Sequence, residues 1–139
     1  MKKAQVAIEF LIVIGVLSLA IIPILFAMHW NAQNSPDRLA ISKGSFSAAR
    51  IASTVDAVGN LGVGTVLRAQ VEMPAVNSVE AGGKELVVNV ETTYGNVAIV
   101  QATQFEINAI DLGKIGAEGT YTIDAWKGDD GKVNLKLVQ

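Results

Sequence analysis

The sequence predicts an α+β protein, in which a long N-terminal hydrophobic helix is followed by a small antiparallel β-sandwich-like domain. Three observations predict this layout. An uncharged apolar run covers 10–28, apolar residues recur at helical spacing over 39–58, and short alternating segments separated by turns fill 65–139. Half of the 139 residues are hydrophobic, and the N-terminal run holds much of that excess. The length therefore suits one small domain with a membrane anchor.

The apolar run from Phe10 to Met28 contains 19 residues and is interrupted by a single glycine, a single serine and Pro23. At about 1.5 Å per residue a helix of this length spans roughly 28 Å, close to the hydrocarbon thickness of a bilayer. Lys2 and Lys3 precede the run, so the positive-inside rule places the N-terminus in the cytoplasm and the rest of the chain outside.

Glu9 separates the competing interpretations of this segment. A secretory signal peptide would need a small-x-small cleavage site, and none stands out after Met28. A simple signal anchor fits the length and the charges but leaves Glu9 unexplained. A carboxylate beside hydrocarbon costs several kcal/mol unless it is paired, which predicts a specific partner for Glu9. The simpler alternative is a glutamate that only marks the edge of the membrane.

The residues Lys2-Lys3-Ala4-Gln5-Val6-Ala7-Ile8-Glu9 resemble the N-terminus of archaeal type IV pilin precursors. In that family a class III signal peptide, a short basic leader, precedes Gln-x-Ser-x-Glu. The resemblance implies that a prepilin peptidase cuts between Ala4 and Gln5, with Lys2 and Lys3 in the leader. This chain departs from the family pattern at Ala4, where the family prefers glycine, and at Ala7, where it prefers serine.

The resemblance also implies how copies of the chain would assemble. The α-amino group released at Gln5 would meet Glu9 of a neighbouring copy, with Phe10 beside the pair, and mispairing would leave buried charges unmatched. The implied product is a homo-oligomeric helical filament on the cell surface, serving adhesion, whose precursor sits in the cytoplasmic membrane with its C-terminal domain outside. An archaellin-like filament subunit is the nearest alternative within the same assembly logic.

A second helical pattern begins at Asn34-Ser35-Pro36-Asp37, where Ser35 is expected as N-cap and Pro36 as the first helical residue. The alternative is one helix continuous through 31–35. The expected apolar stripe has the spacing 3,4,3,4,3 and comprises Ile41, Gly44, Ala48, Ile51, Val55 and Val58. The expected domains are a leader at 1–4, a helix at 5–62 and a β-strand head at 65–139. Within the helix, 5–30 forms the filament core or membrane span and 35–58 packs on the head.

The head is expected to contain short strands joined by turns. Val76–Ala81 and Leu86–Glu91 flank Gly82-Gly83, which is a hairpin signal. Thr120–Trp126 alternates cleanly, with Ile123 on one face and Asp124 on the other. About 75 residues make a small core, so the apolar face of helix 39–58 is expected to complete it.

Neither a catalytic site nor a metal site is expected, and no cofactor. The chain has no cysteine and one histidine, His29, beside the apolar run. Asp129-Asp130-Gly131 lacks the spacing of a calcium-binding EF-hand loop and is expected to form a turn. A formal net charge of −2 without a long basic run argues against nucleic acid as a partner. We therefore expect a structural protein, and the alternative is a membrane-anchored extracellular β-domain that binds a ligand or partner without polymerising.

Overall fold

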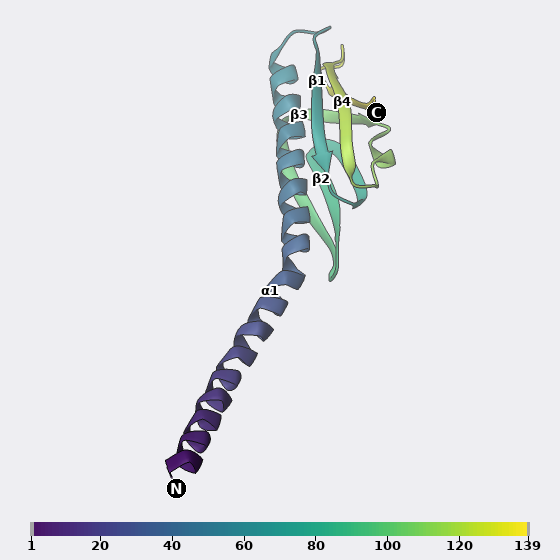
Figure 1. Cartoon of the computed structure of the whole chain (residues 1–139). Helices are drawn as coiled ribbons and strands as arrows, with labels where there is room; N and C mark the ends of the chain where they lie inside the picture. Colours follow the sequence, from purple (N-terminus) through teal and green to yellow (C-terminus); the bar gives the residue numbers. More distant parts are fainter. Residues whose placement is uncertain (1, 139) are drawn as a thin grey trace. The chain divides into compact units, whose positions relative to one another are not determined.

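One long helix precedes a five-stranded sheet in the computed structural model of the chain (Figure 1). The structure describes the backbone of residues 2–138 and the side chains of residues 8–30 and 36–138. The elements are α1 (Lys2–Asn60), β1 (Val66–Met73), β2 (Val76–Thr92), β3 (Gly95–Ile110), the 3₁₀ helix η1 (Leu112–Lys114), β4 (Gly119–Lys127) and β5 (Val133–Leu137). The expected α+β layout is confirmed. The chain divides into two compact units, Met1–Pro36 and Asp37–Gln139, and the second is called the head unit below.

The backbone of α1 is helical through both Pro23 and Pro36. The helix start expected at Ser35 and Pro36 is therefore wrong, and the alternative of a helix continuous through 31–35 is right. Proline fixes φ near its helical value, removes one N–H donor and crowds the carbonyl four residues earlier, which can bend a helix without ending it. A sequence pattern for helix initiation cannot distinguish this case from a break.

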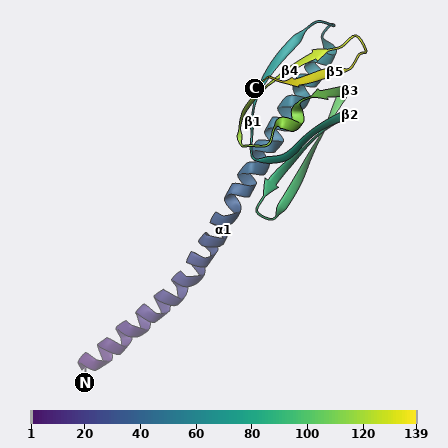
Figure 2. The same cartoon turned by 90° about the vertical axis from the view of Figure 1, so that its right-hand side faces the viewer.

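The strands of the head unit form a single sheet in the order β1-β4-β5-β3-β2 (Figure 2). β5 pairs antiparallel with β4 and parallel with β3, so the sheet is mixed. The antiparallel sandwich expected from the sequence is not confirmed. The C-terminal part of α1 covers one face of the sheet and supplies the apolar layer that a second sheet would otherwise provide.

Strand β2 turns back on itself at Gly82-Gly83, as the hairpin signal predicts. The Asn89 side-chain amide donates to Ser78 Oγ at 2.8 Å, and the Glu91 N–H donates to the Ala75 carbonyl at 3.1 Å. Eleven residues of straight strand would separate Ser78 from Asn89 by roughly 36 Å, so these contacts require a turn between them. Gly83 has φ 60°, a value that glycine adopts without strain.

The core of the head unit lies between α1 and the sheet. The predicted stripe of α1 is confirmed, since the residues from Gly44 to Val58 in it are buried and Ile41 is partly buried. The strand residues that meet this stripe are largely β-branched, which suits a pleated surface. Large strand side chains that are fully buried include Val71, Met73, Leu86, Val88, Val90, Ile123 and Leu135.

Two glycines of α1 allow this close packing. A Cβ atom on Gly44 would lie 2.6 Å from Val90 Cγ2, and one on Gly59 would overlap the Phe105 ring. The end of the helix is also fastened by Lys127, whose Nζ donates to the Gly59 carbonyl at 2.8 Å and lies 5.2 Å from the centre of the Phe105 ring. A lysine there satisfies a terminal carbonyl and complements the negative end of the helix dipole.

Candidate functional site

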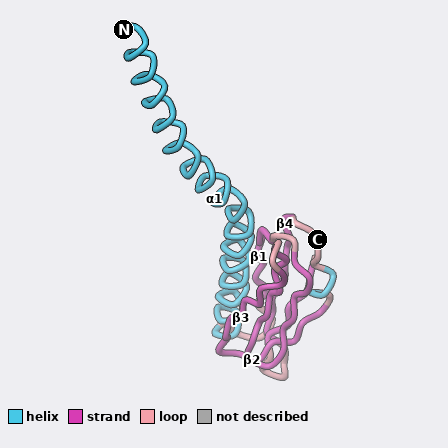
Figure 3. The backbone as a smooth tube through the Cα atoms, turned by 90° about the horizontal axis from the view of Figure 1, so that it is seen from below, coloured by secondary structure: helices cyan, strands magenta, loops and turns pink. Residues whose placement is uncertain are grey.

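The first candidate site is the apolar segment of α1, Ile8–Trp30. By length and composition it could cross a membrane, and its side chains are exposed in the folded chain. Figure 3 shows this part of the chain as regular helix from the N-terminal end. Covering a large apolar side chain is worth about 1.5–3 kcal/mol, so a bare surface of this size requires lipid or protein around it.

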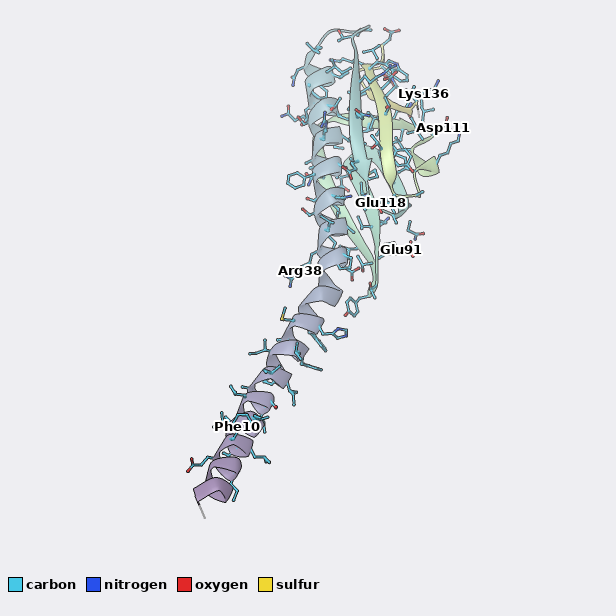
Figure 4. The ribbon with its side chains drawn as sticks, in the orientation of Figure 1. Phe10, Arg38, Glu91, Asp111, Glu118 and Lys136 are labelled. Carbon is cyan, nitrogen blue, oxygen red and sulfur yellow. The ribbon has the colours of Figure 1, made fainter. Side chains whose placement is uncertain are left out.

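Glu9 and Phe10 lie at the start of the apolar segment. Both side chains are exposed, and Figure 4 shows Phe10 projecting from the helix. Among the described residues, Glu9 makes no ion pair. The expected contact joins two copies of the chain, so the assembly role of Glu9, Gln5 and Phe10 stays a prediction. The side chains of Lys2, Lys3, Ala4 and Gln5 lie outside the described residues, so the expected cleavage site stays a prediction.

The opposite end of the segment carries an aromatic pair. The rings of Phe26 and Trp30, one helical turn apart, have centroids 6.2 Å apart and are inclined by 34°. Trp30 is the last residue of the segment, a position where amphipathic aromatic side chains favour the interface between hydrocarbon and water.

The head unit carries several ion pairs on its surface. Lys43 of α1 reaches Glu72 at 2.7 Å and Glu118 at 3.2 Å, and these hydrogen bonds raise the pKa of Lys43, the one to Glu72 most. Arg68 of β1 and Asp124 of β4 form a two-pronged pair at 2.7 and 2.9 Å. The hydrogen bond from Arg68 holds the pKa of Asp124 below its usual value, against the opposing effect of burial.

Some acidic residues in and beside the strands have structural partners. Glu106 pairs with Lys132 at 3.0 Å, and Asp111 pairs with Lys114 at 2.9 Å. Asp130 accepts a hydrogen bond from the Lys132 N–H within the turn before β5. In the part of the chain that the structure describes, no group of three His, Cys, Asp or Glu residues is placed to hold a metal ion.

The second candidate site is the outward side of α1 in the head unit, which the sequence analysis did not single out. Phe46 is 76% exposed there and lines two shallow hollows, one shared with Arg38 and the other with Arg50. Figure 4 shows Arg38 pointing away from the strands. The available sequence signal was a large aromatic residue lying off the buried stripe.

No protein-family model, curated protein or solved structure matches this chain.

Proposed function

We propose that this chain is a structural subunit of an archaeal type IV pilus-like surface filament. The observation that carries the proposal is the exposed apolar segment Ile8–Trp30 with Glu9 at its start, built into the same helix as the core helix of a β-rich head. A subunit of this kind acts by assembly, so its role is structural and not enzymatic.

The chemistry of assembly follows from the cost of exposed hydrocarbon and of unpaired charge. Cleavage by a prepilin peptidase between Ala4 and Gln5 would release an α-amino group and let the apolar segment leave the membrane. Copies would then pack these segments together, which covers the apolar surface that the single chain exposes. Glu9 would pair with the amino group of Gln5 on a neighbour and fix the register between copies, because a shift in register would leave both charges without a partner. The heads would form the outer surface of the filament and serve adhesion.

The first test is the mass and N-terminal sequence of the chain produced in an archaeal host with a prepilin peptidase and a pilus assembly system. We expect a chain that begins at Gln5 and is enriched in filaments sheared from the cells. A chain that keeps Met1 and stays in the membrane would overturn the proposal.

The second test separates the role of Glu9 from that of surface charge in general. We expect Glu9→Ala to abolish sheared filaments while leaving the chain cleaved and membrane-bound. The matched control is Glu80→Ala, because Glu80 is an exposed glutamate of the head unit and its loss should leave filaments intact. Filaments from Glu9→Ala in normal amount would show that this carboxylate does not direct assembly.

The apolar segment also supports a second candidate, a membrane-anchored extracellular domain that never polymerises. By length and composition alone, a helix able to cross a membrane fits both candidates. The anchored domain would be favoured if the chain stayed uncleaved and Glu9→Ala changed neither its location nor its extractability.

A further inference from the structure

The outward side of α1 in the head unit carries two exposed cations. Arg38 and Arg50 are exposed, and neither forms an ion pair with another described residue. They lie on either side of Phe46, the exposed aromatic residue that lines a hollow with each of them. We call Arg38, Phe46 and Arg50 the basic helix face. A large apolar side chain between two unpaired cations suits a surface with an apolar centre and acidic ends.

The same chain presents such a surface on the far side of its sheet. Glu85, Val87 and Glu91 alternate with the buried Leu86, Val88 and Val90, so they face away from α1. Both glutamates are exposed, and neither pairs with a cation in the described part of the chain. We call Glu85, Val87 and Glu91 the acidic strand face.

An exposed valine of β3 widens the apolar centre of the acidic strand face. Val100 pairs in register with Val87 and is 55% exposed. The two valines share one side of the sheet, because directly paired residues of antiparallel strands point the same way.

The two faces also match in spacing. Arg38 and Arg50 are twelve residues apart on a helix, which is about 18 Å along the axis. Glu85 and Glu91 are six residues apart on a strand, which is about 20 Å.

The apolar residues divide these lengths in the same way. Phe46 lies about 6 Å from Arg50 and about 12 Å from Arg38 along the helix. Val87 lies roughly 7 Å from Glu85 and 13 Å from Glu91 along the strand. When the helix runs antiparallel to the second half of β2, the two patterns therefore align. Arg38 then lies opposite Glu91, Phe46 opposite Val87 and Arg50 opposite Glu85.

We propose that the basic helix face of one copy docks on the acidic strand face of a second copy. Within one chain the two faces cannot meet, since the acidic strand face lies on the side of the sheet opposite α1 and Arg38 points away from the strands (Figure 4). The contact uses a different surface on each partner, so a dimer keeps one free face of each kind and further copies can add head to tail. This inference rests on the proposed filament function and names the contact between heads in the filament.

The test uses cysteine pairs in the full-length chain, which has no cysteine of its own. Ser42 lies midway between Arg38 and Phe46, and the exposed Ala98 pairs in register with Asn89, midway between Val87 and Glu91. A chain with Ser42→Cys and Ala98→Cys, oxidised in isolated filaments, should give a ladder of dimers, trimers and longer products that a reductant collapses. The matched control combines Ser53→Cys with Ala98→Cys, because Ser53 is exposed on the same helix but lies about 16 Å further along it.

Charge reversal tests the chemistry of the contact. Arg38→Glu with Arg50→Glu, or Glu85→Lys with Glu91→Lys, should reduce the ladder at least tenfold, and combining all four changes in one chain should restore it. The charged contact should also weaken as ionic strength rises.

The possible outcomes separate this inference from the proposed function. Filaments that assemble normally but give no ladder, or a ladder equal to that of the Ser53 control, would overturn the docking proposal and leave the filament intact. Cross-linking that stops at dimers would also overturn it. A chain that keeps Met1 and forms no filament would instead overturn the proposed function, and the docking proposal would fall with it.

Discussion

The two parts of α1 are both apolar, yet they have opposite surroundings. Side chains of Ile8–Trp30 are exposed in the folded chain, whereas the stripe from Gly44 to Val58 is buried against the sheet. The first part is apolar all round, which suits lipid or a bundle of like helices. The second part confines its apolar residues to one face and places small residues where strands approach. The distribution of apolar residues around a helix, more than their number, therefore determines what covers it.

The strongest test of this comparison places the same charge in each part. Val55→Asp puts a carboxylate where the side chain is fully buried. We expect the free energy of unfolding to fall by at least about 4 kcal/mol, enough to unfold the head unit. Val16→Asp should leave the head folded and reduce membrane retention, since a charge in the middle of a spanning segment is costly. Thermal denaturation of the full chain in detergent, followed by Trp126 fluorescence in a Trp30→Phe background, measures the first effect. Membrane fractionation measures the second. Equal melting temperatures for the two variants would contradict the comparison.

Glycine substitutions test the same difference between the two parts of α1 at the level of packing. Gly59→Ala drives a methyl group into the Phe105 ring, and such overpacking should cost about 1–3 kcal/mol. Gly15→Ala meets no atom within 4 Å, so the melting temperature of the head unit should not change. A shift of roughly 4–8 °C per kcal/mol is expected for a domain of this size. If both variants melted with the wild type, the close approach of α1 to β3 would not limit stability.

The contact between Lys127 and the end of α1 should contribute less. Lys127→Met keeps the apolar stem but removes the hydrogen bond to the Gly59 carbonyl and the ring contact with Phe105. We expect the free energy of unfolding to fall by about 1 kcal/mol. The control is Lys84→Met, because Lys84 is exposed and its loss should be neutral. Hydrogen exchange of the amides near residues 55–60 should accelerate only in the Lys127 variant, and equal protection in both would assign no role to this lysine.

The smallest effect concerns pH and the pair between Arg68 and Asp124. The hydrogen bond from Arg68 lowers the pKa of Asp124 in the folded state below its unfolded value, which is about 3.9. The pair therefore contributes stability above that pH, and the contribution is lost as pH falls through the folded pKa. Arg68→Gln should lower the melting temperature slightly at neutral pH. Below about pH 4, the melting temperature of the variant should change less with pH than that of the wild type. If the melting temperatures of the variant and the wild type changed equally across this pH range, the pair would have no role.

Much of the head unit could be predicted from local patterns. The stripe from Gly44 to Val58 and the alternation of Ile123 with Asp124 each follow from one period of repeating side chains. The turn at Gly82-Gly83 follows from the backbone freedom of glycine. The single mixed sheet could not be predicted, because strand order depends on pairings between residues far apart in the sequence, such as Ile107 with Val133.

The candidate sites divide in the same way. Glu9 beside an apolar run is visible in the sequence, because its cost in lipid depends only on its neighbours along the chain. Phe46 between Arg38 and Arg50 became a candidate only when the structure showed which face of α1 the sheet leaves open.

Three features follow from local sequence alone, because each depends on residues within a few positions of one another: the apolar segment, the buried stripe of α1 and the positions of the turns. Tertiary packing was needed to show that α1 continues through Pro36 and that the strands form one mixed sheet. It was also needed to show that charges of opposite sign, which form no ion pair among the described residues, face outward on α1 and on β2. These features arise from packing and pairing between distant segments, whose free energy no local pattern records.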